Sequence, residues 1–112
     1  MKTSSAKAKG RRLQQWVRDR ILERSPQLTE DDVRSTSMGA GGEDVQLSTA
    51  AREVFPFSVE CKSRKGIAVY RDYEQAQGNA PPNSEPIVVI KENRKKPLVI
   101  VDAEYFMNRM LK

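Results

Sequence analysis

The sequence contains no histidine and a single cysteine, Cys61, among its 112 residues. Without histidine, the chain cannot form a histidine-ligated metal site, a Ser-His-Asp triad or the zinc centre of a deaminase. One cysteine excludes an intramolecular disulfide and a cysteine zinc site. Any hydrolytic chemistry must therefore depend on carboxylates, lysines and a hard cation such as Mg²⁺, which prefers oxygen ligands.

Long apolar runs are also absent. No stretch approaches the roughly 18 apolar residues that can span a membrane, and no signal peptide is visible, so we expect a cytoplasmic protein without a membrane partner. The length suits one domain. We expect a flexible N-terminal tail over residues 1–6 and a single domain over residues 7–112.

Positive charge is concentrated at the N-terminal end. The chain carries a net charge of +5, of which residues 1–24 carry +6 and the remainder −1. This asymmetry favours a polyanionic partner, although a basic helix can also be simply a solvated face. The candidate phosphate ligands are Lys7, Lys9, Arg11, Arg12, Arg64 and Lys65, with Ser37 of a glycine-rich loop as a further candidate.

Apolar spacing predicts the elements. Residues 7–24 form a helix with an apolar stripe that includes Trp16, which we expect in the core. Further helices are predicted over residues 67–79 and from Ala103, with a helical turn over 48–54 capped by Ser48 or Thr49; strands are predicted over 43–47, 57–62, 87–90 and 98–101. The last two strands are uniformly apolar, which is typical of strands buried on both faces. The fold class is therefore α/β, with a mixed sheet of about four strands flanked by helices.

Two acids and a lysine form the most informative pattern. Glu60 and Lys62 lie two apart on one strand, so their side chains share a face, while Cys61 points to the apolar side. Asp44 opens the preceding strand after the glycine loop, and it reaches the same edge if the two strands pair. Two carboxylates at one edge repel each other, and a divalent cation relieves that repulsion. Alone, however, a Glu-x-Lys triplet is also a common exposed charge pattern.

Asp44 with Glu60-Cys61-Lys62 resembles the signature of the PD-(D/E)XK nuclease superfamily. The wider pattern, with Lys9-Gly10 opening a basic helix and Ser63-Arg64 following the lysine, is similar to small Holliday junction resolvases of phages and archaea. The similarity covers residues 7–111 and implies a restriction-endonuclease-like fold. It also implies Mg²⁺ as cofactor, with Mn²⁺ as a substitute and no small-molecule cofactor.

The resemblance assigns roles residue by residue. Asp44 and Glu60 match the metal-binding acids, with the Cys61 carbonyl as a further ligand, and Lys62 matches the catalytic lysine. Gln75 lies where such nucleases often place a supporting glutamine. Archaeal resolvases carry a glutamate ligand in the first helix, but this chain has Gln14 there. The ligand from this helix is Gln14, Glu23 or none.

The expected function is Mg²⁺-dependent cleavage of four-way DNA junctions by a homodimer, since two paired nicks need two active sites. One alternative is another DNA nickase or recombination nuclease of the same superfamily. A second is a DNA-binding module that keeps the fold without the reaction, for which Gln14 is the feature in favour.

Overall fold

One mixed five-stranded sheet organises the chain in the computed structural model, which describes residues 4–36 and 41–111. The strands are β1 (Val33–Ser35), β2 (Val45–Leu47), β3 (Phe57–Ser63), β4 (Glu85–Lys91) and β5 (Leu98–Ile100), and they lie side by side in that order. Only the central pair, β3 and β4, is parallel. The other neighbouring strands are antiparallel. Parallel strands need a crossover connection, and α3 (Val69–Asn79) supplies it.

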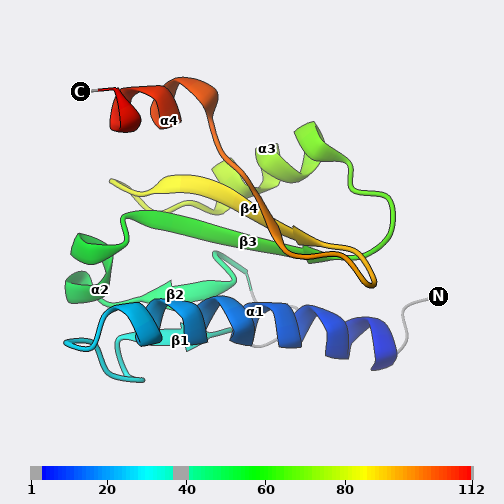
Figure 1. Ribbon diagram of the computed structural model, residues 1–112, viewed down its shortest axis with the longest axis horizontal. Helices are drawn as coiled ribbons and strands as arrows, with labels where there is room; N and C mark the ends of the chain where they lie inside the picture. Colours follow the sequence, from blue (N-terminus) through cyan, green and yellow to red (C-terminus); the bar gives the residue numbers. More distant parts are fainter. Residues whose placement is uncertain (1–3, 37–40, 112) are drawn as a thin grey trace.

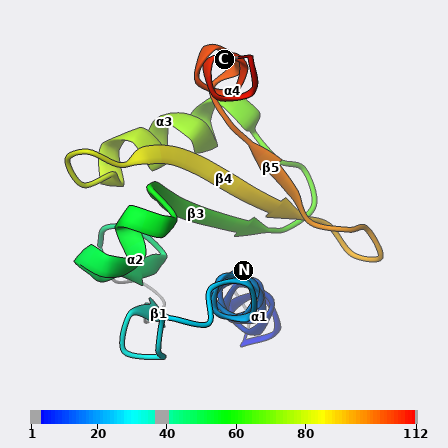
Figure 2. The same ribbon diagram turned by 60° about the vertical axis from the view of Figure 1, so that its left-hand side comes forward.

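Two helices cover opposite faces of this sheet. The long helix α1 (Ser4–Arg24) packs along β1, β2 and β3, whereas α3 packs against β3 and β4 (Figures 1 and 2). The remaining helices are the short α2 (Thr49–Val54), which follows β2, and α4 (Ala103–Met110), which closes the chain. Within the described ranges, no helix is both long and apolar enough to cross a membrane.

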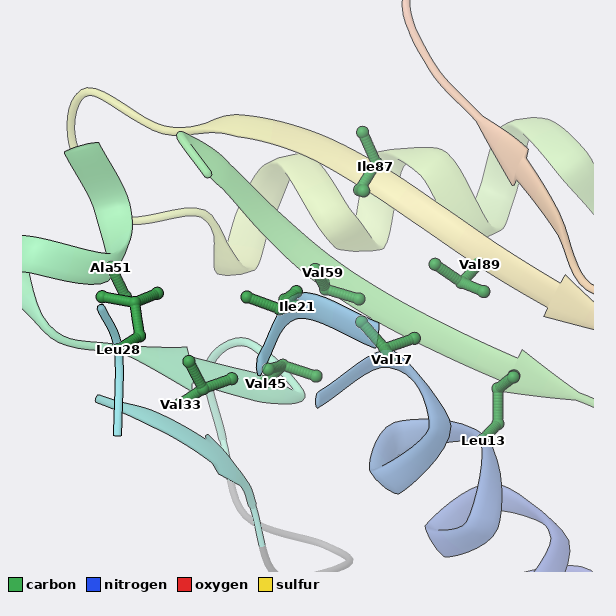
Figure 3. Close-up of a cluster of buried hydrophobic side chains, with 10 residues drawn as sticks. All are labelled: Leu13, Val17, Ile21, Leu28, Val33, Val45, Ala51, Val59, Ile87 and Val89. Atoms are coloured by element: carbon green, nitrogen blue, oxygen red, sulfur yellow. The ribbon is translucent and has the colours of Figure 1, made fainter. Parts of the chain in front are cut away.

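The main core lies between α1 and the sheet. Leu13, Val17 and Ile21 are spaced four apart, so they form one line on α1 and pack against the sheet (Figure 3). The residues that complete this core are Leu28, Val33, Val45, Ala51, Val59, Ile87 and Val89. Because Val59 faces α1, strand alternation turns its neighbours Ser58 and Glu60 toward the α3 face.

Trp16 corrects the sequence-based expectation. It is 40% exposed, whereas Leu13 and Val17 are almost fully buried, so the prediction that Trp16 lies in the core is wrong. The reason is angular: Trp16 precedes Val17 by one residue, about 100° around the helix, which places the ring at the edge of the buried stripe.

The sheet has five strands rather than the expected four or so, and the missed strand is β1. It contains only three residues, Val33-Arg34-Ser35, and two of them are polar. The helix α1 begins at Ser4, earlier than the expected Lys7. The short helix at 49–54 and its Ser48 cap are confirmed, since the Ser48 hydroxyl accepts a hydrogen bond from Ala51 N.

The two apolar strands near the C-terminus behave differently. In β4, Ile87, Val88 and Val89 are buried, as their uniformly apolar pattern predicts. In β5, by contrast, Leu98 is 52% and Val99 is 56% exposed, so the prediction of a strand buried on both faces is wrong. The physical reason is helix placement, because α1 packs mainly on β1 and β3 and α3 packs on β3 and β4, which leaves the edge strand β5 largely uncovered.

Candidate active site

Asp44 lies where the pairing between β2 and β3 ends. Its backbone N–H donates to the Val59 carbonyl oxygen at 2.8 Å. Its carboxylate Oδ2 accepts a hydrogen bond from the Cys61 N–H, two residues further along β3, at 2.7 Å. The side chain thus replaces a backbone acceptor at the edge of β3. This pair of contacts holds the Asp44 carboxylate next to the Glu60-Cys61 peptide.

Glu60 and Lys62 project from β3 toward α3. Glu60 is buried, with 4% of its surface exposed, and its Oε2 lies 3.3 Å from Lys62 Nζ. Lys62 Nζ also donates to Gln75 Oε1 of α3 at 2.7 Å. The other Glu60 oxygen, Oε1, accepts a hydrogen bond from Asn79 Nδ2 at 3.3 Å. The acid and the lysine are therefore fixed by two polar residues of α3.

Asn79 is the member of this cluster that the sequence patterns did not predict. It follows Gln75 by four residues, so the two side chains lie one turn apart on the same face of α3. That spacing is visible in the sequence and is the signal that could have identified Asn79. The local sequence instead favours a loop from this residue onward, because Asn-Ala-Pro-Pro is a typical helix end.

Cys61 contributes its backbone to the site and its side chain to the core. In a strand, the N–H and C=O of one residue point toward the same neighbour. Because the Cys61 N–H reaches Asp44, its carbonyl oxygen is directed to the same edge. The thiol is half-buried and packs against the main core. Burial, followed by the nearby negative charges of Asp44 and Glu60, raises the pKa of this thiol well above its usual value.

Electrostatics at Asp44 favour a cation. Burial of the carboxyl, together with the negative charge of Glu60, raises its pKa to about 6 against the opposing effects of the Cys61 N–H and the Lys62 charge. A divalent cation between the acids would stabilise the ionised form. No cluster of three or more acidic or cysteine side chains suited to a metal exists among the described residues. Two carboxylates and the Cys61 carbonyl would therefore need water as further ligands, which fits the habit of Mg²⁺.

Gln14 is buried beneath the sheet edge. It is 3% exposed, and its Oε1 accepts a hydrogen bond from the Ser35 hydroxyl of β1 at 2.9 Å. Ser35 precedes Thr36, whose N–H donates to the Asp44 carbonyl oxygen. Gln14 is thus connected to the strand beside Asp44. Glu23, the other candidate, forms an ion pair with Arg20 near the end of α1. Glu23 lies about 13 Å from Gln14 along the helix axis.

The expected phosphate ligands fall into two groups. Lys7, Lys9, Arg11 and Arg12 lie on the N-terminal half of α1, and none of them forms an ion pair with another described residue. Lys65 is exposed just beyond β3. Arg64 instead contacts both carboxylate oxygens of Asp72 at 2.9 and 3.0 Å. Ser37 lies outside the described residues.

The raised pKa of Asp44 has a measurable effect on stability. A carboxyl whose pKa rises on folding favours the protonated native state, so its stability contribution is present at low pH and is lost as pH rises toward about 6. We expect metal-free Asp44→Asn to be more stable than wild type by about 1–2 kcal/mol at pH 7.5, a difference already reduced by solvent screening. The difference should vanish near pH 4, as measured by urea unfolding in EDTA.

The exposed Asp31→Asn is the matched control and should show no such trend, because its carboxylate is almost fully solvated. Addition of Mg²⁺ should reverse the order by stabilising only proteins that retain Asp44. Equal pH profiles for wild type and Asp44→Asn would contradict a desolvated carboxyl at this position.

No family model matches the chain, and searches of curated proteins and of solved structures returned no match.

Proposed function

We propose that the chain is a Mg²⁺-dependent endonuclease of the PD-(D/E)XK type that cleaves four-way DNA junctions. The observation that carries the proposal is the meeting of Asp44, Glu60 and Lys62 at the end of the β2–β3 pairing. Asp44 is anchored by Cys61 N at 2.7 Å, and Lys62 lies between Glu60 and Gln75. This is the arrangement that the resemblance implies for two metal-binding acids and a catalytic lysine.

Each residue of the site has a separate role in the proposed reaction. Asp44, Glu60 and the Cys61 carbonyl would hold Mg²⁺, with Mn²⁺ as a substitute. The bound ion would supply Lewis acidity for a water nucleophile and for the scissile phosphate. Lys62 offers a compact positive charge that orients the attacking water or stabilises charge on the phosphate. Gln75 keeps the Lys62 ammonium at the site through its 2.7 Å hydrogen bond. Such an enzyme would act in the cytoplasm, which is that of the host cell if a phage encodes it.

Substrate selectivity separates the resolvase from other nucleases of this type. We expect Mg²⁺-dependent nicking of a four-way junction to exceed that of a flap and of linear duplex with the same sequences. A preference for the flap or the duplex would instead favour a nickase or a recombination nuclease. The expected ligands on DNA are the basic residues of α1 together with Lys65, so junction binding should weaken as salt increases.

A DNA-binding module without catalysis is the second candidate. Gln14 favours it, because a neutral amide is a weaker ligand than the glutamate of archaeal resolvases and here already accepts a hydrogen bond from Ser35. Calorimetry with Mn²⁺ distinguishes the candidates. A binding heat that disappears in Asp44→Asn supports the enzyme, whereas no binding heat in wild type supports the module.

A symmetric dimer completes the proposal, and β5 with α4 forms its interface. None of the α4 residues is buried within one chain. Large apolar side chains are exposed along both elements: Leu98, Val99, Phe106, Met107, Met110 and Leu111. An eight-residue helix is not stable in water without packing. A second copy of the same surface supplies that packing and brings two active sites together, as paired nicking requires.

The dimer predicts a specific effect of charge at this surface. Met110 is 65% exposed in one chain, so Met110→Lys should leave the protomer folded while raising the dimer dissociation constant at least about tenfold. Sedimentation equilibrium measures this change. Val54→Lys is the matched control, since Val54 of α2 is also an exposed apolar residue, at 45%, and lies outside the proposed interface; it should leave the constant unchanged. A wild-type chain that remains monomeric at micromolar concentration would refute the dimer.

A further inference from the structure

A cleft separates the N-terminal half of α1 from the turn between β4 and β5. In Figure 1 this turn lies above the N-terminal half of α1. Two adjoining cavities, of about 270 and 400 Å³, share Lys9, Ser63 and Asn93 in their walls. The first extends along α1 to Trp16, and the second extends past the end of β3 to Arg64 and Lys65.

The first cavity combines an apolar side with cationic walls. Leu13, Trp16 and Pro97 provide the apolar surface. Lys9 and Arg12 line it from α1, and Lys91 lines it from β4 on the opposite side. The acid at the cleft, Glu92, lies in the second cavity and is already paired with Lys95 at 3.3 Å. The cleft is therefore complementary to a ligand with a flat apolar part and a negative charge.

We propose that this cleft binds one unpaired nucleotide of a DNA strand. The base packs on the cavity side of the Trp16 indole, whose ring is also contacted by the Arg20 guanidinium at 5.3 Å from its centroid. The phosphate lies between Lys9, Arg12 and Lys91, and Asn93 lines the same cavity beside the base. Base–aromatic stacking beside a cationic groove is the general mode of single-strand recognition. The inference rests on the proposed function and deepens it, because it takes DNA as the ligand and adds a second contact for the substrate.

The size and walls of the cleft favour a nucleotide over an acidic peptide. A volume of about 270 Å³ is slightly below the range of ligand pockets, which starts near roughly 300 Å³, so the cavity suits one nucleotide rather than a duplex. Cations on both walls suit a phosphodiester that runs through the cleft. An aromatic face is the surface on which a planar base gains most, whereas the carboxylate side chains of an acidic peptide gain no stacking there.

The position of the cleft explains how it would affect substrate choice. Ser63, in its wall, directly follows Lys62, and Glu60 lies about 10 Å from Ser63 along the strand. The acids face α3 whereas the cleft lies on the α1 side, so a DNA strand whose phosphate is at the acids would pass the C-terminal end of β3 to reach the cleft. Extruding a base from an intact duplex costs a few kcal/mol, but a base at a branch point is already partly unstacked. The cleft would thus favour branched DNA.

Trp16 makes the proposal directly measurable, because it is the only tryptophan of the chain. A short oligo(dT) should quench its fluorescence saturably in EDTA, where cleavage cannot occur. An equal length of blunt duplex should quench it much less. An abasic oligonucleotide of the same charge should bind at least about fivefold more weakly than oligo(dT), since it lacks the stacking partner. Equal affinity for the abasic strand would overturn the base-binding role.

Matched variants on the same hairpin test the phosphate contact. Lys91→Gln should weaken oligo(dT) binding severalfold and reduce its salt dependence. Lys96→Gln removes the same charge from an exposed position on the same turn that lines neither cavity, and it should have little effect. Equal effects of the two substitutions would overturn the proposal. Trp16→Leu, followed by anisotropy of a labelled oligo(dT), should reduce affinity about tenfold, and an unchanged affinity would also overturn it.

Three further outcomes distinguish the nucleotide cleft from a peptide site and from the nuclease activity. If a polyglutamate peptide quenches Trp16 as strongly as oligo(dT), the cleft is a peptide site and the proposal fails. If the quenching pattern holds but Mg²⁺ produces no cleavage of any DNA, the cleft stands and the nuclease function fails. If junctions are cleaved but no DNA quenches Trp16, the nuclease function stands and the cleft proposal fails.

Discussion

Asp44→Asn and Glu60→Gln should each reduce cleavage of a four-way junction by about 10³-fold or more while the protein stays folded. Each substitution keeps the shape of the side chain but removes a negative charge that Mg²⁺ requires. The amide oxygen introduced by Asp44→Asn can still accept the Cys61 N–H, so the 2.7 Å contact that positions this side chain need not be lost. Single-turnover cleavage of a labelled junction at saturating enzyme isolates the chemical step from binding.

DNA affinity is the internal control in this experiment. Neither acid attracts DNA, so junction binding in EDTA should be retained or slightly tighter after either substitution. Glu74→Gln is the matched variant, because Glu74 is an exposed acid on α3 next to Gln75, and it should cleave at the wild-type rate. Undiminished cleavage by both site variants would remove the basis of the proposed function.

The second large effect concerns Arg64, which the sequence patterns assign to DNA. Asp72 is buried in the first turn of α3, and Arg64 Nη2 contacts both of its carboxylate oxygens at 2.9 and 3.0 Å. Replacing Arg64 with Met leaves a buried carboxylate without its counter-charge. We expect a loss of about 2–3 kcal/mol in the free energy of unfolding, less than for a fully buried pair because 38% of the Arg64 side chain is exposed.

Urea denaturation at pH 7 measures this loss. Lys65→Met, one residue away and exposed, removes the same charge and should change stability by no more than about 0.5 kcal/mol. Adding Asp72→Asn to Arg64→Met should recover part of the loss, since the unpaired charge is then absent. Equal stability of the Arg64 and Lys65 variants would mean that the ion pair with Asp72 contributes nothing to stability, and Arg64 would again be a candidate DNA ligand.

Much of the candidate site follows from local sequence patterns. Strand alternation alone places Glu60 and Lys62 on one face and Cys61 on the other, and the structure has that arrangement. The sequence predicts that Asp44 reaches the same edge only if its strand pairs with this one, because alternation within one strand contains no information about its partner. The backbone contact from Cys61 to Asp44 resolves that condition.

Burial differs from what the sequence patterns predict where it depends on which elements lie next to a strand or helix. The apolar runs of β4 and β5 look alike, yet β4 is central and buried whereas Val99 of the edge strand is exposed. Trp16 shares the helical spacing of Leu13 but lies at the edge of the stripe, next to a cleft formed by the β4–β5 turn. Asn79 belongs to the site because α3 packs over Glu60, and a pattern within one segment does not show such packing.

The sequence by itself determined which kinds of reactive group are present and how they are placed locally. The lack of histidine, the Glu60-Cys61-Lys62 triplet and the basic N-terminal helix are properties of composition and short-range spacing, which do not depend on the fold. Tertiary structure decided which distant residues meet: Asp44 with Cys61, Lys62 with Gln75, and Arg64 with Asp72. Such contacts depend on strand order and helix packing, and a periodic pattern in one segment cannot encode the distance to another.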